Sequence, residues 1–226
     1  MNKIDNCSLL HLMQLTSSFF PSGGFAYSQG LESAVKLGWL NSTSEFEFWQ
    51  TCIINEQLTY LDWPMLKRMY FCIQNNDHRR LLFYVDQLLS FRETFELRME
   101  EKERGRALVR LITHLSFELE ECWLLSCQNS ILASISWLGC RWKIPLNALA
   151  MGYAYVFIEN LVTAGLKLIP FGQVSAQKFL MNSFKLLPDA WQNANLLTDD
   201  ELGSSFPLQS IASSYHEIQK FRLFRS

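Results

Sequence analysis

One serine in this sequence has neighbours that resemble a catalytic motif. Ser28 lies in the run Ala26-Tyr27-Ser28-Gln29-Gly30, one residue away from the Gly-x-Ser-x-Gly motif of a serine nucleophile. That motif needs a strand before the serine, whereas the residues before Ser28 have helical spacing, and Ala26 replaces the glycine of the strained turn. The favoured interpretation is a corner between two helices, in which Ser28 is a surface or capping hydroxyl. A serine hydrolase using Ser28 is the alternative.

Phosphate and metal chemistry have little support in the sequence. A phosphate-binding loop would need a lysine directly after its last glycine, and Leu31 follows Gly30. The three adjacent acids of residues 199–201 lack the helical spacing that turns carboxylates toward one point, so a capped loop is expected there. No histidine has a second His or Cys at chelating spacing; the histidines are His11, His78, His114 and His216. We therefore expect no catalytic residue, no metal site and no intrinsically bound cofactor.

Composition narrows the classes of partner. The chain has 226 residues, 49% of them hydrophobic, which is enough for a large core and excludes disorder over most of its length. A net charge of −2 provides no basic field for nucleic acid. The 17 Phe and 7 Trp exceed the needs of a core of this size, so we expect some of them at protein partner surfaces.

The cysteines and the termini bear on the compartment. The six cysteines include no Cys-x-x-Cys pair and no disulfide-framework spacing, so they are predicted to be free, buried thiols of a reducing compartment. The first residues lack the basic and apolar parts of a signal peptide. The longest apolar run, residues 144–168, contains Glu159, Asn160 and Lys167, which favours a buried helix over a membrane span. The expected location is the cytoplasm.

The corner around Ser28 is predicted to join two helices. Pro21 disfavours helical backbone in the residue before it, so the first helix should end there. Gly23 and Gly24 form the hinge, because they accept backbone angles closed to other residues and allow close approach. A second helix is expected over residues 25–37.

The rest of the chain also has helical periodicity. No stretch alternates like a strand, and no repeat of about 20 to 50 residues occurs. The predicted fold is all-α: a single-domain bundle of roughly ten helices over residues 1–210, with an extended tail at 211–226. Three helix starts are expected: one at a capping box of Ser42 with Glu45 or of Ser44 with Glu47, one at Asp62 and one at Asp77. Further helices are expected over 94–115 and over 118–138, and Gly139 should end the second of these. A long helix should follow Pro145, and a last one should cover 174–187 and end at Pro188.

Two of these segments have unusual composition. Residues 94–115 are rich in charge around an apolar stripe; a solvated face is the favoured interpretation and a partner-binding face the alternative. The tail mixes cations with Phe221, Leu223 and Phe224, which are costly to leave in water. It is therefore predicted to order against a partner.

Several segments together resemble one known family. They are residues 12–18, the run Pro21-Ser22-Gly23-Gly24-Phe25-Ala26-Tyr27-Ser28-Gln29-Gly30-Leu31-Glu32, residues 92–94 with 96–98, residues 165–173, and the ending Arg222-Leu223-Phe224-Arg225-Ser226. In this order and over nearly the whole chain, they resemble the UreF family of urease accessory proteins. Phe20, Ser22, Ala26 and Tyr215 depart from the family's usual residues.

The resemblance implies a function and a set of partners. Proteins of this family are non-enzymatic, all-helical chaperones of urease, often dimeric. They bind the UreD accessory protein, also called UreH, and through it recruit the UreG GTPase. The assembly inserts nickel into apo-urease, so the resemblance implies that the complex handles the nickel.

The resemblance also assigns residues to partners. Glu32, Asp62 and Lys167 occupy the positions that face the GTPase, and we expect the two acids at helix beginnings or exposed edges. The tail positions that order against the UreD-type partner are His216, Phe221, Arg222, Leu223, Phe224 and Arg225.

Overall fold

The computed structural model describes residues 4–21, 23–203 and 206–226. Its helical elements are α1 (Asn6–Thr16), η1 (Gly24–Ala26), α2 (Leu31–Lys36), α3 (Thr43–Ile53), η2 (Ile54–Asp62), α4 (Trp63–Gln74), α5 (His78–Phe91), α6 (Phe95–His114), α7 (Glu121–Asn129), α8 (Ile131–Arg141), α9 (Leu146–Leu168), α10 (Gln173–Leu196), η3 (Asp199–Glu201) and α11 (Pro207–Glu217).

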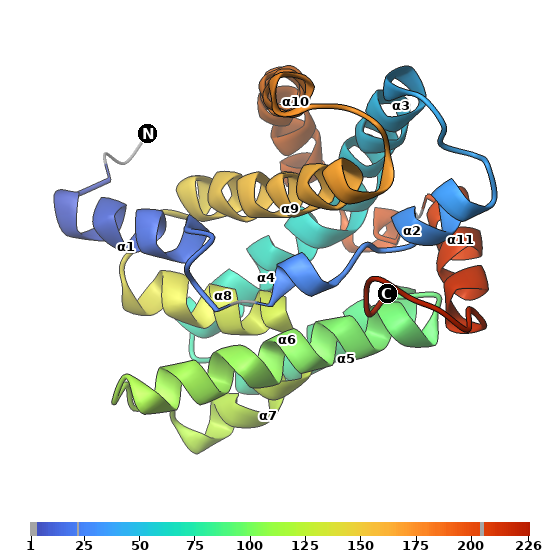
Figure 1. Cartoon of the computed structure of the whole chain (residues 1–226). Coiled ribbons are helices and arrows are strands. Elements are labelled where there is room, and N and C mark those ends of the chain that lie inside the picture. Colours follow the sequence, from blue (N-terminus) through green and yellow to red (C-terminus); the bar gives the residue numbers. More distant parts are fainter. Residues whose placement is uncertain (1–3, 22, 204–205) are drawn as a thin grey trace.

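The predicted all-α bundle is confirmed. The described residues contain no strand, and their helices surround one hydrophobic cluster. The long helix α9 packs against α1, α4 and α10, while α8 packs against α4, α6 and α7 (Figure 1). The expected boundary between body and tail, at residue 210, falls inside α11. Only residues after α11 form the irregular end of the chain.

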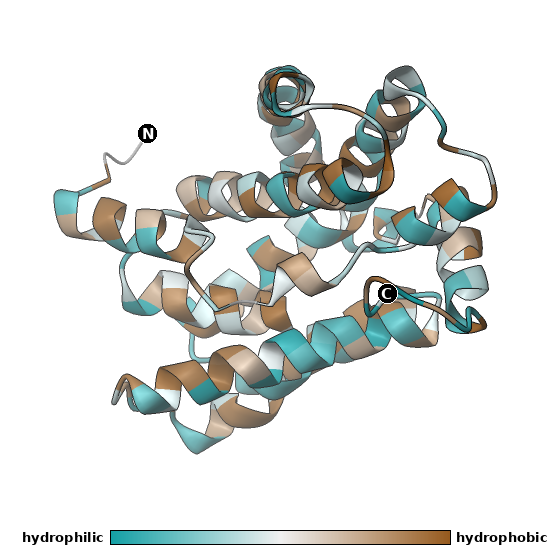
Figure 2. Ribbon diagram, in the orientation of Figure 1, coloured by the Kyte–Doolittle hydropathy of each residue, from teal (hydrophilic) through white to brown (hydrophobic). Residues whose placement is uncertain are grey.

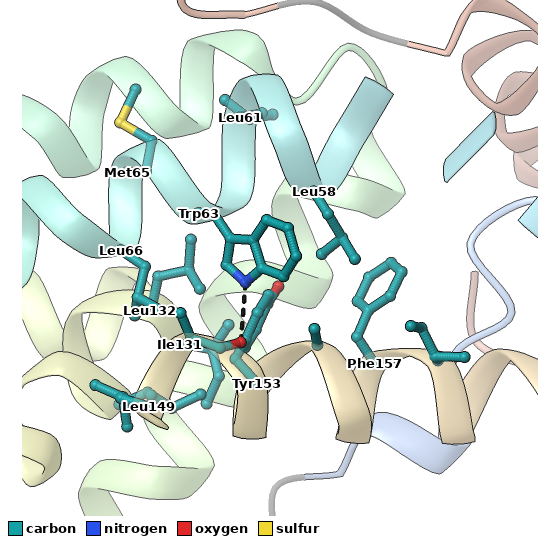
Figure 3. Packing of buried hydrophobic residues seen from close by; sticks show 14 of the residues in the cluster. Leu58, Leu61, Trp63, Met65, Leu66, Ile131, Leu132, Leu149, Tyr153 and Phe157 are labelled. Carbon is teal, nitrogen blue, oxygen red and sulfur yellow. Dashed lines mark hydrogen bonds between the residues drawn. The ribbon is translucent and has the colours of Figure 1, made fainter. Parts of the chain in front are cut away.

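The centre of the core is built around Trp63. Its ring is fully buried, and its indole N–H donates to the backbone oxygen of Ala150 at 2.9 Å. This hydrogen bond ties α4 to α9, and aliphatic side chains of α4, α8 and α9 pack around it (Figure 3). The hydrogen bond compensates the Trp63 N–H for the hydration that it loses in the core.

The helix α9 behaves as a core helix. Among the described residues it is the one helix long and apolar enough to cross a membrane, and 61% of its most apolar window is buried inside the protein. Figure 2 shows the contrast between the largely apolar α9 and the hydrophilic stretch of α6 below it. Glycines of α9 allow close packing of neighbours: a methyl group on Gly152 would lie 2.7 Å from Leu12, and one on Gly165 would lie 2.7 Å from Phe46.

Several predicted caps are confirmed. Ser42 and Glu45 form the first of the two possible capping boxes. Asp77 caps α5, accepting from the Arg80 amide at 3.0 Å. The acids of residues 199–201 lie in a capped 3₁₀ turn, which Thr198 begins, as the sequence predicted.

The second helix starts later than expected. Residues 24–26 form a separate 3₁₀ turn, and α2 begins only at Leu31, so the prediction of one helix over 25–37 is wrong. Gln29 and Gly30 both have positive φ, of 52° and 84°, which no continuous helix allows. The corner is therefore a longer irregular segment than its apolar spacing indicates.

The predicted helix over 118–138 is two helices. α7 ends at Asn129, and Ser130 has extended backbone, while its hydroxyl accepts from the Ala133 amide at 3.2 Å to cap α8. Gly139 lies inside α8 and does not end it. A serine can cap a helix as readily as it can continue one, so the apolar pattern hid this break.

Two further boundaries differ from the prediction. Pro188 lies inside α10, which continues to Leu196, because Ala190 and Ala194 are buried against the core and this packing outweighs the lost backbone hydrogen bond. At Asp62 a new helix, α4, begins one residue later, close to the expected start, but the Asp62 side chain does not cap it, because the π-helix η2 ends at Asp62 and runs directly into α4.

The cysteines are all free, but only Cys72 and Cys127 are buried. Cys7 and Cys122 are exposed, and Cys52 and Cys140 are half-buried, so the prediction of six buried thiols holds for two of them and is wrong for the exposed pair. Burial raises the pKa of Cys127 to about 12, which keeps that thiol protonated and unreactive.

Candidate partner-binding site

The corner and the end of the chain meet in space. The irregular loop after α11 returns to α2 and to the start of α6, where the carboxyl terminus lies (Figure 1). The Ser226 backbone oxygen accepts from the amides of Ser28 and Gln29 at 2.6 and 3.1 Å, and the Arg225 amide donates to Ala26 at 2.8 Å. Residues 26–29 and 225–226 thus form one hydrogen-bonded unit.

The two hinge glycines differ: Gly23 has a backbone angle that other residues rarely adopt, and Gly24 has close neighbours. Gly23 has a φ of 71°, and Gly24 is buried so closely that a methyl group there would lie 2.4 Å from the amide nitrogen of Asn160. Pro21 follows the end of α1. Ser22, which stands between them, lies outside the described residues.

Ser28 is buried and its hydroxyl is engaged. Its Oγ donates to the Ser226 backbone oxygen at 2.6 Å and accepts from the Glu32 amide at 3.3 Å. The sequence predicted a surface or a capping hydroxyl. The Ser28 hydroxyl is a capping one, and it does not lie on the surface. In the described residues it has no histidine as a hydrogen-bond partner, so the arrangement of a serine nucleophile with its base is not formed.

Glu32 holds the end of the chain from the side of α2. Its carboxylate accepts from the Leu223 amide at 2.9 Å, from the Phe224 amide at 2.9 Å and from Lys36 Nζ at 2.8 Å. Burial alone raises the pKa of Glu32, but these three hydrogen bonds outweigh it, so the pKa lies below its ordinary value. The carboxylate is therefore ionised at neutral pH and provides a fixed negative charge for the tail.

A buried cluster of charges joins α11 to the body. His216 is fully buried, with Nδ1 2.7 Å from Glu96 Oε2 and Nε2 3.4 Å from Glu32 Oε2. Arg222 donates to the other oxygen of Glu96 at 2.7 Å. The resemblance assigns His216 to a partner protein, but both of its ring nitrogens already face carboxylates of its own chain.

Lys167 contacts the tail at a side chain. Its ammonium lies 5.2 Å from the centre of the Phe224 ring, in cation–π geometry. Phe224 is buried, although Lys167 is exposed. Glu32 and Lys167 therefore both contact the docked tail.

Asp62 belongs to a different part of the molecule. It is fully buried and accepts from Arg92 at 2.7 Å, Tyr153 at 3.0 Å and Gln57 at 3.2 Å. Burial raises the pKa of Asp62, and Arg92 opposes this shift. Glu32 lies in the first turn of α2 and Asp62 directly before α4, as expected of acids at helix beginnings. Neither lies at an exposed edge, since both carboxylates are enclosed by partners from distant segments.

The charged helix α6 is not a solvated face along its whole length. Glu100 and Arg104 pair at 2.9 Å with both side chains buried, and Glu101 is buried beside Arg92 at 3.2 Å. The favoured interpretation of this helix is therefore wrong for these residues. The favourable i, i+4 order of Glu100 and Arg104 predicted their pairing but not their burial.

Exposed apolar side chains lie along α11 and the segment after it. We call this surface the carboxyl-terminal ridge. Its members share exposure to solvent, and on α11 they recur at intervals of three and four residues, which places them on one helix face. The ridge consists of Leu208, Ile211, Tyr215, Ile218, Phe221 and Leu223. Phe221 is 86% exposed and Leu223 64% exposed.

These observations define a class of protein. In the described residues, the polar side chains of Ser28 and His216 are paired inside the chain, and no group of three or more His, Cys, Asp or Glu side chains could hold a metal ion. The site offers solvent the apolar side chains of the ridge, with exposed cations of the tail among them. The chain is therefore of the class of all-helical proteins that expose apolar surface of the kind found at binding sites for other proteins.

Comparison with known proteins identifies the family. Residues 40–183 match the family model described as UreF. The chain is 48% identical over 219 residues to the urease accessory protein UreF of Blochmanniella floridana, covering 97% of this chain and 96% of the relative. It is 50% identical to that of Blochmanniella pennsylvanica over 97% and 96% of the two chains, and 45% identical to that of Pseudomonas putida strain W619 over 97% and 98%. The chain belongs to the UreF family.

Proposed function

We propose that the chain is a urease maturation factor: a non-enzymatic adaptor that joins the UreD/UreH accessory protein to the UreG GTPase for nickel insertion into apo-urease. The link to urease rests on the family, whose members above are each named urease accessory protein. The adaptor role rests on the character of the site, which presents surface for binding and keeps its candidate nucleophile buried.

The carboxyl-terminal ridge is the observation that carries the adaptor role. Large apolar side chains that remain in water in the isolated chain gain free energy when a partner covers them, and such residues dominate protein interfaces. Phe221 and Leu223 stand at the end of the ridge, on a segment whose inner side is held by Glu32. In this proposal the ridge takes the UreD-type partner.

The proposal includes a location, an oligomeric state and a place for the metal. The chain works in the cytoplasm as a homodimer, and nickel is held by donors that the assembled complex supplies. A second apolar face, exposed on α1, would be covered by the other copy; it consists of Leu9, Leu10 and Met13.

Co-purification tests the adaptor role. The tagged full chain should retain the UreD-type accessory protein, and the GTPase should join that pair. A chain that lacks residues 221–226 should retain neither, while its far-ultraviolet circular dichroism stays helical. Undiminished retention by the shortened chain would remove Phe221 and Leu223 from the proposal. Failure of the full chain to retain the accessory protein would overturn the adaptor role itself.

A further inference from the structure

Two of the three residues that the family resemblance assigns to the GTPase, Glu32 and Lys167, are contacts of the tail. Glu32 accepts the amides of Leu223 and Phe224 at 2.9 Å each, so it fixes the backbone of the tail. Lys167 lies over the buried Phe224 ring at 5.2 Å. The two residues come from α2 and α9 and contact the same short segment, Glu32 at its backbone and Lys167 at a side chain.

The carboxylate of Glu32 has little capacity left for another protein. It is buried, and it also receives Lys36 Nζ at 2.8 Å and faces His216 Nε2 at 3.4 Å. A partner that bound Glu32 directly would have to displace the tail first. The ammonium of Lys36 reinforces the arrangement, because it also donates to Gln219 Oε1 at 2.6 Å and to the Phe221 backbone oxygen at 2.7 Å.

We propose that Glu32 and Lys167 are positioning residues for GTPase recruitment, which act by holding residues 221–226 in their docked place and not by touching the GTPase. This inference rests on the proposed adaptor function. The docked tail and the corner form one continuous surface, since the Ser226 backbone oxygen accepts hydrogen bonds from the amides of Ser28 and Gln29. Loosening the tail at Leu223 or Phe224 therefore disturbs the surface that a partner must recognise.

Amide hydrogen exchange in the isolated chain tests the docking directly. Glu32→Ala removes the acceptor of two tail amides, so exchange at Leu223 and Phe224 should accelerate at least about tenfold; Glu32→Gln, which keeps one acceptor oxygen, should have a smaller effect. Lys167→Met keeps the aliphatic stem and removes only the cation, and should accelerate Phe224 by a few-fold. Lys178→Met, at an exposed lysine of α10, is the matched control and should change neither amide.

Capture of the GTPase by the chain bound to its accessory partner then tests the consequence. Capture should fall in the order of amide protection, with Glu32→Ala lowest, Lys167→Met intermediate and Lys178→Met unchanged. In a Phe224→Leu background, which has no ring for the cation to cover, Lys167→Met should cause no further loss of capture.

The possible results separate the inference from the function on which it rests. Loss of capture with unchanged protection at Leu223 and Phe224, or a further loss from Lys167→Met in the Phe224→Leu background, would show direct contact and overturn the inference. Lost protection with full capture would also overturn it. If the unaltered chain captures neither partner, the adaptor function fails, whereas the exchange rates still report whether Glu32 and Lys167 hold the tail.

Discussion

Replacing Arg92 by Met should lower the free energy of unfolding by about 3–5 kcal/mol. The Arg92 guanidinium lies 2.7 Å from Asp62 and 3.2 Å from Glu101, and all three side chains are buried. Burial alone lowers the pKa of Arg92, but the two carboxylates raise it by more than burial lowers it. The net shift is upward, so the guanidinium stays charged. Without the guanidinium, two carboxylates would remain in the core beside each other with their main counter-charge gone.

Urea denaturation of the variant and of a matched control measures this effect. Arg106→Met removes a guanidinium of the same size from an exposed pair with Glu103 on α6, and should cost less than about 1 kcal/mol. Adding Asp62→Asn to Arg92→Met should restore part of the lost stability, because it removes one of the uncompensated charges. Equal, small losses for Arg92→Met and Arg106→Met would contradict a buried ion network around Asp62.

The double substitution of Phe221 and Leu223 by Ser should weaken binding of the UreD-type partner by at least about 100-fold. Interface anchors of this kind each contribute about 2 kcal/mol or more, and the two lie two residues apart on the carboxyl-terminal ridge. Both side chains are mostly in solvent in the isolated chain, so their loss should leave its stability nearly unchanged. The dissociation constant, measured by biolayer interferometry, gives the result.

The control for the ridge is an exposed aromatic residue elsewhere. Phe83 on α5 is 59% exposed, and Phe83→Ser should leave the dissociation constant unchanged. Comparable weakening by Phe83→Ser would place the binding surface outside the ridge. Unchanged binding by the ridge variant, with intact folding, would show that the accessory partner does not use Phe221 and Leu223.

The helices themselves could be predicted from the sequence, because their signals are local. Capping by Ser42 and Asp77 depends on side chains within a few residues, and both were predicted correctly. Ser130 and Pro188 were misjudged for the opposite reason. Whether a serine breaks a helix, or a proline is tolerated in one, depends on packing against segments far away in the chain.

The environments of the site residues could not be predicted, since distant segments create them. Glu32 is buried by the tail some 190 positions later, at Leu223 and Phe224, and nothing near Glu32 in the sequence signals this. Asp62 is paired with Arg92 of the segment after α5. The tail itself was expected to order against another protein, and in the structure its inner side is ordered by its own chain, which leaves the ridge for a partner.

Binding of the GTPase to immobilised UreD-type accessory protein, with and without this chain, tests the adaptor role most directly. The account predicts that the GTPase is retained only after the chain has been loaded onto the accessory protein, and that loading the Phe221 and Leu223 double variant leaves the signal at background. Equal retention of the GTPase in the absence of the chain, or none after the chain is loaded, would contradict the account.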